Sequence, residues 1–171
     1  MQFEPPCGRW VREREKKTDL SESVCIVPGS VYNNIVPPSR LGHGTDFHLF
    51  KEGIKPEWED PACAQGGKWT INVPKSGGGK AILDTWWLHT MLALIGEQFN
   101  ETDEICGAVL SVRNRQDRVA IWTKTANNEA AQLSIGRQIK QVLDVGDNTQ
   151  IGYLTFQDAK NEKRPKDVYT V

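Results

Sequence analysis

The sequence lacks the features that mark membrane, secreted and zinc-binding proteins. Its 171 residues contain no apolar run close to the roughly 20 residues that a membrane helix needs. The residues after Met1 form no apolar core of a leader, so we expect no secretion. The four cysteines show no Cys-x-x-Cys spacing, which argues against a zinc site. We therefore expect a cytoplasmic protein, with the nucleus as a second location, that holds no metal or cofactor.

The chain also lacks an excess of charge of either sign. The chain has 21 Lys and Arg residues against 22 Asp and Glu residues, so no general attraction to nucleic acid or membranes follows. Three scattered histidines, without a serine elbow or a metal triad, provide no apparatus for catalysis. We expect a binding protein rather than an enzyme, with no affinity for membranes or DNA. Any contact with RNA must come from a local patch.

Tryptophan, by contrast, is abundant. The 6 Trp residues outnumber the 5 Phe and 3 Tyr residues, which favours stacking surfaces in addition to core packing. Apolar periodicity predicts helices over residues 82–99 and 127–143 and a mobile loop over 158–167. Alternation predicts five strands, and a hairpin joins two of them, so the expected fold is α+β with an antiparallel sheet. The predicted strands are 45–50, 68–73, 106–113, 118–123 and 151–156.

The predicted hairpin carries a candidate phosphate site. With a four-residue turn, Arg113 and Arg118 face each other across the ladder, and alternation puts Trp122 on the same face. Guanidinium groups suit phosphate because their planar fork donates two parallel hydrogen bonds, and an indole offers a flat surface to a base. A solvated hairpin tip is the alternative interpretation.

A second candidate site is the pair Trp58-Glu59. An indole can stack on guanine while the neighbouring carboxylate accepts hydrogen bonds from N1–H and the N2 amino group. Adenine does not present those two donors together and would leave the carboxylate unpaired. Taken alone, the same residues also fit an exposed acidic turn. Together with the two arginines they describe a site for a purine nucleotide and its phosphates.

Several motifs, in this order and spacing, resemble the mRNA cap-binding translation initiation factor 4E family, and plant members in particular. They are Trp58-Glu59-Asp60-Pro61, Gly66-Gly67-Lys68-Trp69, Trp87-Leu88, Leu94-Ile95-Gly96-Glu97, Ile105-Cys106-Gly107-Ala108-Val109, Val112-Arg113, Ile121-Trp122-Thr123 and Ile135-Gly136. The resemblance implies a curved antiparallel sheet backed by helices on its convex face, with the cap site in the concave face. It also implies translation initiation and its regulation in protein biosynthesis as the function.

The resemblance also implies roles for single residues. Trp58 would stack on 7-methylguanine and Glu59 would read the base, Trp122 would contact the methylated edge, and Arg113 and Arg118 would bind the triphosphate. Trp69, Trp86 and Trp87 would be structural.

Beyond the cap, the resemblance implies protein partners and a redox-sensitive pair. Leu88 and Leu92 would bind a short helix of the scaffold factor 4G, or of binding proteins with a Tyr-x-x-x-x-Leu-hydrophobic motif. Cys63 and Cys106 would form a disulfide or, in a reducing cytosol, stay as two free buried thiols.

The amino end departs from the family pattern. Residues 1–30 show no sustained period, so we expect a poorly ordered arm followed by a cap-binding domain over 31–171 that lacks the first strand. Pro28-Gly29 stands where the family has a Phe-Trp dipeptide, and Trp10 is the only indole upstream. An alternative function is therefore open, in which the chain binds partners only or is a non-functional variant with weakened cap affinity.

Overall fold

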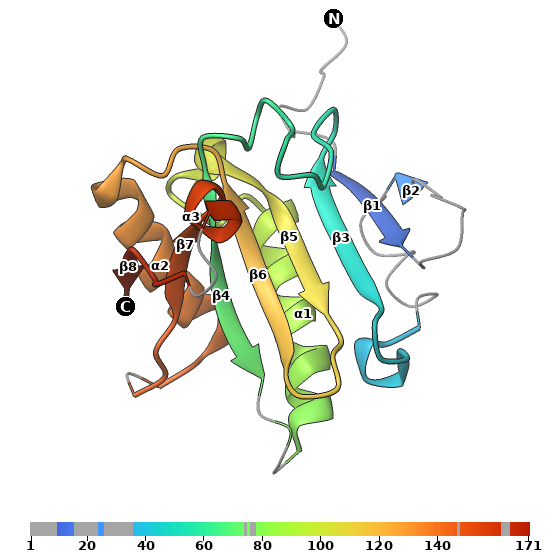
Figure 1. The fold of residues 1–171 in the computed structure, drawn as a ribbon. Helices are drawn as coiled ribbons and strands as arrows, with labels where there is room; N and C mark the ends of the chain where they lie inside the picture. The colour runs from blue at the N-terminus through green and yellow to red at the C-terminus, as the bar shows by residue number, and fades with distance from the viewer. Residues whose placement is uncertain are drawn as a thin grey trace, which may run out of the picture.

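One antiparallel sheet of eight strands organises the molecule, in the order β2-β1-β3-β5-β6-β4-β7-β8 (Figure 1). The computed structural model describes residues 10–15, 24–25, 36–73, 75, 78–146, 148–161 and 165–171. The strands are β1 (Trp10–Glu15), β2 (Val24–Cys25), β3 (Asp46–Lys51), β4 (Gly67–Val73), β5 (Ile105–Ser111), β6 (Asp117–Thr123), β7 (Gly152–Thr155) and β8 (Tyr169–Thr170).

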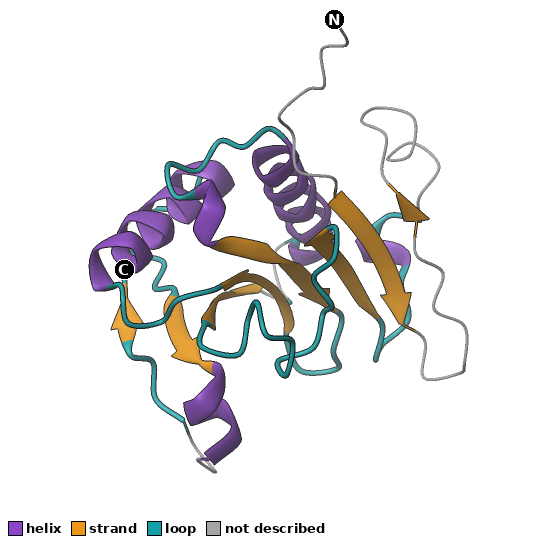
Figure 2. Ribbon diagram, turned by 90° about the horizontal axis from the view of Figure 1, so that it is seen from above, coloured by secondary structure: helices purple, strands orange, loops and turns teal. Residues whose placement is uncertain are grey.

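In the described part of the chain, helices lie on both sides of the curved sheet (Figure 2). Helices α1 (Gly79–Ile95) and α2 (Glu129–Leu143) form the covering layer, and the short α3 (Phe156–Asn161) follows β7 directly. Two single turns of 3-10 helix, Pro38–Arg40 and Thr102–Glu104, precede β3 and β5. The predicted α+β class, with helices on the convex face of a curved antiparallel sheet, is confirmed. None of the helices in the described part of the chain could span a bilayer.

The amino-terminal region contributes to this sheet. Strand β1 pairs with β3 along its length, with Trp10 opposite Lys51 and Glu15 opposite Asp46, and β2 pairs with β1. The expectation that residues 1–30 add no strand is therefore corrected: backbone pairing can recruit a segment that lacks apolar periodicity. The expected poor order of the arm concerns residues 1–9, 16–23 and 26–30, which lie outside the described residues.

Glycines determine where α1 begins and ends. Gly78 precedes the helix with φ of 89°, a left-handed conformation that glycine adopts without strain. The helix ends at Ile95 because Gly96 follows, and Glu97 has φ of 49°. The predicted end at residue 99 was therefore too late. Phe99 is nevertheless buried, in the turn beyond the helix.

The main core lies between the sheet and the two covering helices. Trp69 from β4 and Trp87 from α1 are almost fully buried in it, as the family resemblance implied. Gly136 lets α2 approach the sheet, because a Cβ atom there would lie 2.8 Å from the ring of Trp69. The buried Gln132 of α2 accepts a hydrogen bond from the Trp69 indole (3.2 Å), so the indole is satisfied inside the core.

The carboxyl-terminal part contains more regular structure than the sequence predicted. The last long strand ends at Thr155, and α3 follows where the end of that strand and the start of a mobile loop were expected. Thr155 starts the helix: its hydroxyl accepts a hydrogen bond from the Asp158 N–H and donates one to the Asp158 carboxylate. Strand β8 then pairs with β7 at the sheet edge.

Candidate functional site

The face of the sheet opposite α1 and α2 carries two rows of side chains that run across neighbouring strands. The arginine row is formed by Asp46, Ser111, Arg118 and Asn72. The tryptophan row is formed by Phe50, Gly107, Trp122, Lys68 and Leu154. Arg118 and Trp122 are four residues apart on β6, so about 13 Å separates the two rows.

Aromatic contacts hold Trp122 in place. Its ring centroid lies 5.3 Å from that of Phe50, edge to face, and 4.5 Å from that of Phe156 at the start of α3. These rings belong to a second, smaller apolar cluster, on the concave side of the sheet. The Trp122 indole is only half-buried, so part of its surface stays open.

The loop between β3 and β4 presents the Trp58-Glu59 pair. Trp58 exposes 40% of its surface, and Glu59 is exposed beside it. Asp60 shapes this loop, because its carboxylate accepts hydrogen bonds from the N–H groups of Lys55 (3.0 Å) and Ala62 (2.9 Å). The indole and the carboxylate of this pair thus lie on a turn and not on a strand.

Helix α3 brings Trp58 and Trp122 to the same end of the sheet. Phe156 contacts Trp122, and one turn later Lys160 places its Nζ 4.5 Å from the centroid of the Trp58 ring. Residues four apart share a face of a helix, so one face of α3 contacts both indoles. The ammonium group over Trp58 shows that this ring attracts a cation.

Arg113 lies at the Asp46 end of the arginine row. Its Nη2 donates to both carboxylate oxygens of Asp46 at 2.8 Å, and its Nη1 donates to the Val112 carbonyl at 3.1 Å. The predicted pairing of Arg113 with Arg118 is wrong: the hairpin loop covers residues 112–116, and Ser111 lies opposite Arg118. Both arginines still reach the same end of the concave face, since Asp46 and Arg118 belong to one row.

Lys68 and Asp46 are two members of the site that sequence reasoning did not select. Lys68 lies directly opposite Trp122, and its pKa is lowered, first by burial and second by the positive charge of Arg118. Alternation along 68–73 could have identified Lys68, because it lies on the opposite face from Trp69. Alternation along 45–50 likewise places Asp46 on the face opposite Phe47, but its contact with Arg113 gave no signal because it links residues far apart in the sequence.

Cys63 and Cys106 lie together in the smaller apolar cluster. Both are fully buried and free. Cys106 donates its S–H to the Ala62 carbonyl (3.7 Å). The neighbouring Cys106 thiol lowers the pKa of Cys63, and the Cys63 thiol together with burial raises the pKa of Cys106 well above its usual range. The structure thus brings the predicted pair together as thiols. The disulfide stays a prediction.

Leu88 and Leu92 lie on the other side of the molecule, on α1. Leu92 exposes 55% of its surface, whereas Leu88 is half-buried. Residues four apart share a helix face, so the two leucines form one outward apolar patch. Trp86 packs against the core instead, in agreement with its implied structural role.

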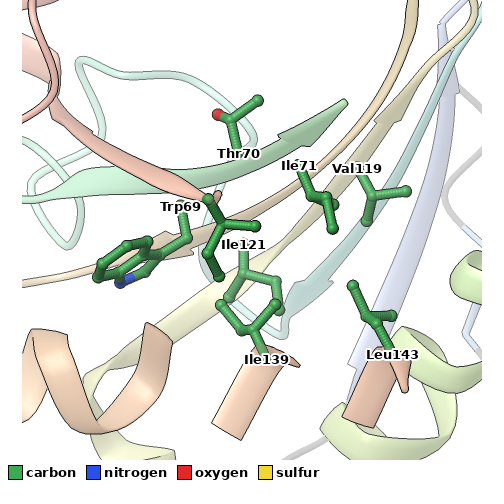
Figure 3. A pocket seen from close by; sticks show the side chains of 8 residues that line it. Trp69, Thr70, Ile71, Val119, Ile121, Ile139 and Leu143 are labelled. Atoms are coloured by element: carbon green, nitrogen blue, oxygen red, sulfur yellow. The ribbon is translucent and has the colours of Figure 1, made fainter. Parts of the chain in front are cut away.

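A small pocket between the sheet and α2 is part of the packing rather than a ligand site. Ile139 and Leu143 of α2 point toward Ile121 and Val119 of β6 across it (Figure 3). Its volume is about 10 Å³, room for one water at most, and apolar side chains dominate its lining.

Fold and site together define a class of binding protein in which a helix-backed sheet presents indoles and cationic side chains on its open face. A model of the family described as Eukaryotic initiation factor 4E matches residues 29–170, and the chain belongs to this family. Eukaryotic translation initiation factor 4E-1 of Triticum aestivum is 61% identical over 142 residues, which cover 82% of this chain and 63% of the wheat protein. The Arabidopsis thaliana protein of the same name is 54% identical, over 82% of this chain and 57% of its own.

Solved structures of the family agree with the fold over nearly all of the chain. Ascaris suum eIF4E-3 in complex with an m2,2,7G cap superposes with a TM-score of 0.87 at 33% identity, covering 100% of this chain and 99% of its own. Caenorhabditis elegans eIF4E-3 with the 4E-binding protein Mextli gives a TM-score of 0.85 at 34% identity, covering 96% and 97%. The chain spans less than two thirds of the length of the plant relatives named above.

Proposed function

We propose that this protein binds the 7-methylguanosine cap of mRNA in the cytoplasm and acts in translation initiation. One observation carries the proposal: α3 contacts both Trp58 and Trp122, so two indoles lie at the end of a concave face that also holds Arg113, Arg118 and Lys68. The Ascaris suum relative was solved with a bound cap, which favours cap binding over a function limited to protein partners.

Trp58 and Glu59 supply the chemistry for the base. The exposed indole stacks on guanine, and N7 methylation makes the base cationic, so stacking gains a cation–π attraction of about 1–2 kcal/mol. The Lys160 ammonium, 4.5 Å from the centroid of the Trp58 ring, supports this role. The Glu59 carboxylate accepts two hydrogen bonds from the guanine edge, and Trp122 contacts the methylated side.

Cationic side chains of the two rows supply the chemistry for the phosphates. Lys68 adjoins Trp122 in the tryptophan row, and Arg118 and Arg113 lie about 13 Å further along the sheet. A ligand that stacks at the indole end can therefore extend its triphosphate toward the arginines. Arg113 is pre-oriented for this by Asp46, which fixes the guanidinium plane before any ligand arrives.

We further propose that the patch of Leu88 and Leu92 binds an amphipathic helix, from the scaffold factor 4G or from a binding protein with a Tyr-x-x-x-x-Leu-hydrophobic motif. The exposure of Leu92 on the outer side of α1 supports this. The Caenorhabditis elegans relative, solved with a 4E-binding protein, supports a partner of this class. Since the patch and the concave face are on opposite sides of the sheet, both ligands can bind at once.

Titration of tryptophan fluorescence with 7-methyl-GTP and with GTP tests the cap-binding proposal. We expect 7-methyl-GTP to bind at least tenfold more tightly, because only the methylated base is cationic. Glu59→Gln should weaken 7-methyl-GTP binding about tenfold or more, since one guanine donor then meets an amide N–H₂ group instead of an acceptor. Glu57→Gln, an exposed glutamate in the same loop, is the matched control and should leave the affinity unchanged.

Two results would contradict the proposal. Equal affinities for 7-methyl-GTP and GTP would remove the basis for cap recognition. An equal loss in the Glu57 and Glu59 variants would show that charge near the loop, rather than base reading, determines affinity.

A further inference from the structure

Asp117, the first residue of β6, lies beneath the loop that carries Arg113. It is 5% exposed, and its Oδ1 oxygen accepts two hydrogen bonds. The donors are the backbone N–H of Arg113 at 2.9 Å and the Nζ of Lys75 at 2.7 Å. The family motifs and the proposed cap chemistry leave this carboxylate without a role.

The hydrogen bond that Asp117 accepts holds the Arg113 backbone, together with hydrogen bonds made by the preceding residue. On the other side of the loop, Val112 donates its N–H to Thr45 (3.0 Å) and accepts the N–H of Gly44 (2.8 Å). Val112 is thus tied to the segment before β3, and Arg113 is tied to the start of β6. With Val112 and the Arg113 N–H held in this way, the Arg113 guanidinium contacts Asp46 at 2.8 Å.

The charge of the Asp117 carboxylate already has a partner of opposite sign. Lys75 neutralises the Asp117 carboxylate, and Asp46 already provides the anionic partner of the Arg113 guanidinium. In addition, Asp117 supplies an acceptor oxygen within hydrogen-bond distance of the Arg113 N–H.

We propose that Asp117 is a positioning residue for phosphate binding: its buried carboxylate fixes the Arg113 backbone and so aims the guanidinium at the phosphates of the ligand. The inference rests on the proposed cap-binding function. It differs from a purely structural role because it affects the phosphate end of the site and leaves the base end, some 13 Å away, unaffected.

Two conservative variants distinguish the effect of the acceptor's position on ligand binding from the effect of its charge. Asp117→Asn keeps an oxygen acceptor in place and removes the charge, whereas Asp117→Glu keeps the charge and displaces the acceptor by one methylene. We expect Asp117→Glu to weaken 7-methyl-GTP binding about tenfold, as for one well-placed hydrogen bond to a charged group, and to leave 7-methylguanosine binding within about twofold. Asp117→Asn should stay within about twofold of the parent protein for both ligands.

Asp84→Glu is the matched control. Its carboxylate also accepts a backbone N–H, that of Ser39 at 2.8 Å, but it lies on α1, on the convex side of the sheet. This variant should bind both ligands like the parent. Hydrogen exchange of the Arg113 amide, measured without ligand, is a second readout: we expect protection in the parent and in Asp117→Asn, and faster exchange in Asp117→Glu.

Three results would overturn the inference. They are a larger loss in Asp117→Asn than in Asp117→Glu, equal losses for 7-methyl-GTP and 7-methylguanosine, and unchanged exchange of the Arg113 amide in Asp117→Glu. Failure of the proposed function is recognised separately, because the parent protein would then not prefer 7-methyl-GTP over GTP, whereas the amide exchange does not depend on any ligand.

Discussion

Burial separates the tryptophans of this chain into two groups. Trp69 and Trp87 are nearly inaccessible and pack between the sheet and its helices, whereas Trp58 and Trp122 keep part of their surface open on the concave side. Buried indoles need a partner for their N–H group, and Trp69 obtains one from Gln132. An exposed ring needs a fixed orientation instead, and Trp122 receives it from Phe50 and Phe156.

Gln132 is the polar centre of the core. It is 0% exposed; its Oε1 accepts from the Trp69 indole (3.2 Å) and the Thr123 hydroxyl (3.3 Å), and its Nε2 donates to the Thr125 carbonyl (3.0 Å). Gln132→Leu leaves the buried indole N–H and the carbonyl without this partner. We expect it to lower the free energy of unfolding by about 2–4 kcal/mol, measured by urea denaturation.

Gln141→Leu is the control for this prediction, because Gln141 is exposed on the same helix. A surface change of this kind should stay within about 0.5 kcal/mol. Equal stability of the Gln132 and Gln141 variants would show that the buried network contributes nothing beyond side-chain volume.

Among the elements, α3 is the part of the fold on which the proposed base site depends. The sequence after residue 157 has few apolar residues and many lysines, so it predicts a mobile loop. The capping of Asp158 by Thr155 and the contacts of Phe156 and Lys160 with the two indoles make it a helix instead. The contact of Lys160 with Trp58 joins residues about a hundred positions apart, which no local pattern can reveal.

Helix α1 packs against the core on one side and carries the leucine patch on its outer side. The outer side can be tested directly. Leu92→Glu places a charge in the proposed helix-binding patch at a position that is 55% exposed. We expect it to abolish binding of a Tyr-x-x-x-x-Leu-hydrophobic peptide in calorimetric titration, because the charge must lose its water on binding. The affinity for 7-methyl-GTP and the stability should hardly change, since the site is exposed and remote from the concave face.

Gln141→Glu adds the same charge to the exposed side of α2 and should leave peptide binding intact. If both glutamates reduce peptide binding equally, the general charge of the protein rather than this patch governs it. Retained binding in Leu92→Glu would place the peptide elsewhere.

For the molecule as a whole, ligand binding should raise the melting temperature. A ligand at a hundred times its dissociation constant stabilises the folded state by about 2.7 kcal/mol. For a chain of this size we expect 7-methyl-GTP to raise the melting temperature by roughly 5–10 °C in differential scanning fluorimetry. GTP at the same concentration should raise it much less.

Salt distinguishes the two halves of the site in the same measurement. The arginines act through charge, which about 0.5 M salt screens strongly, whereas indole stacking depends little on ionic strength. The shift caused by 7-methyl-GTP should shrink at high salt, and the shift caused by 7-methylguanosine should persist. Salt-independent shifts for both ligands would mean that phosphate contacts add little to binding.

Local patterns in the sequence were sufficient to predict most of the elements and the face of each strand that enters the core. They also supplied the candidate residues of a purine nucleotide site. Strands β3 to β6 and helices α1 and α2 follow from periodicity, because side chains two or about 3.6 residues apart share a face whatever surrounds them. Trp58, Glu59, Arg113, Arg118 and Trp122 were selected by their chemistry and by motif.

How those residues meet depended on the tertiary structure. The fold recruited β1 into the sheet and set the register that puts Ser111 rather than Arg113 opposite Arg118. It also brought Asp46, Lys68 and Asp117 to the proposed site. The physical reason is that register, ion pairs and buried hydrogen bonds depend on distances between segments remote in the chain. Local periodicity carries no information about those distances.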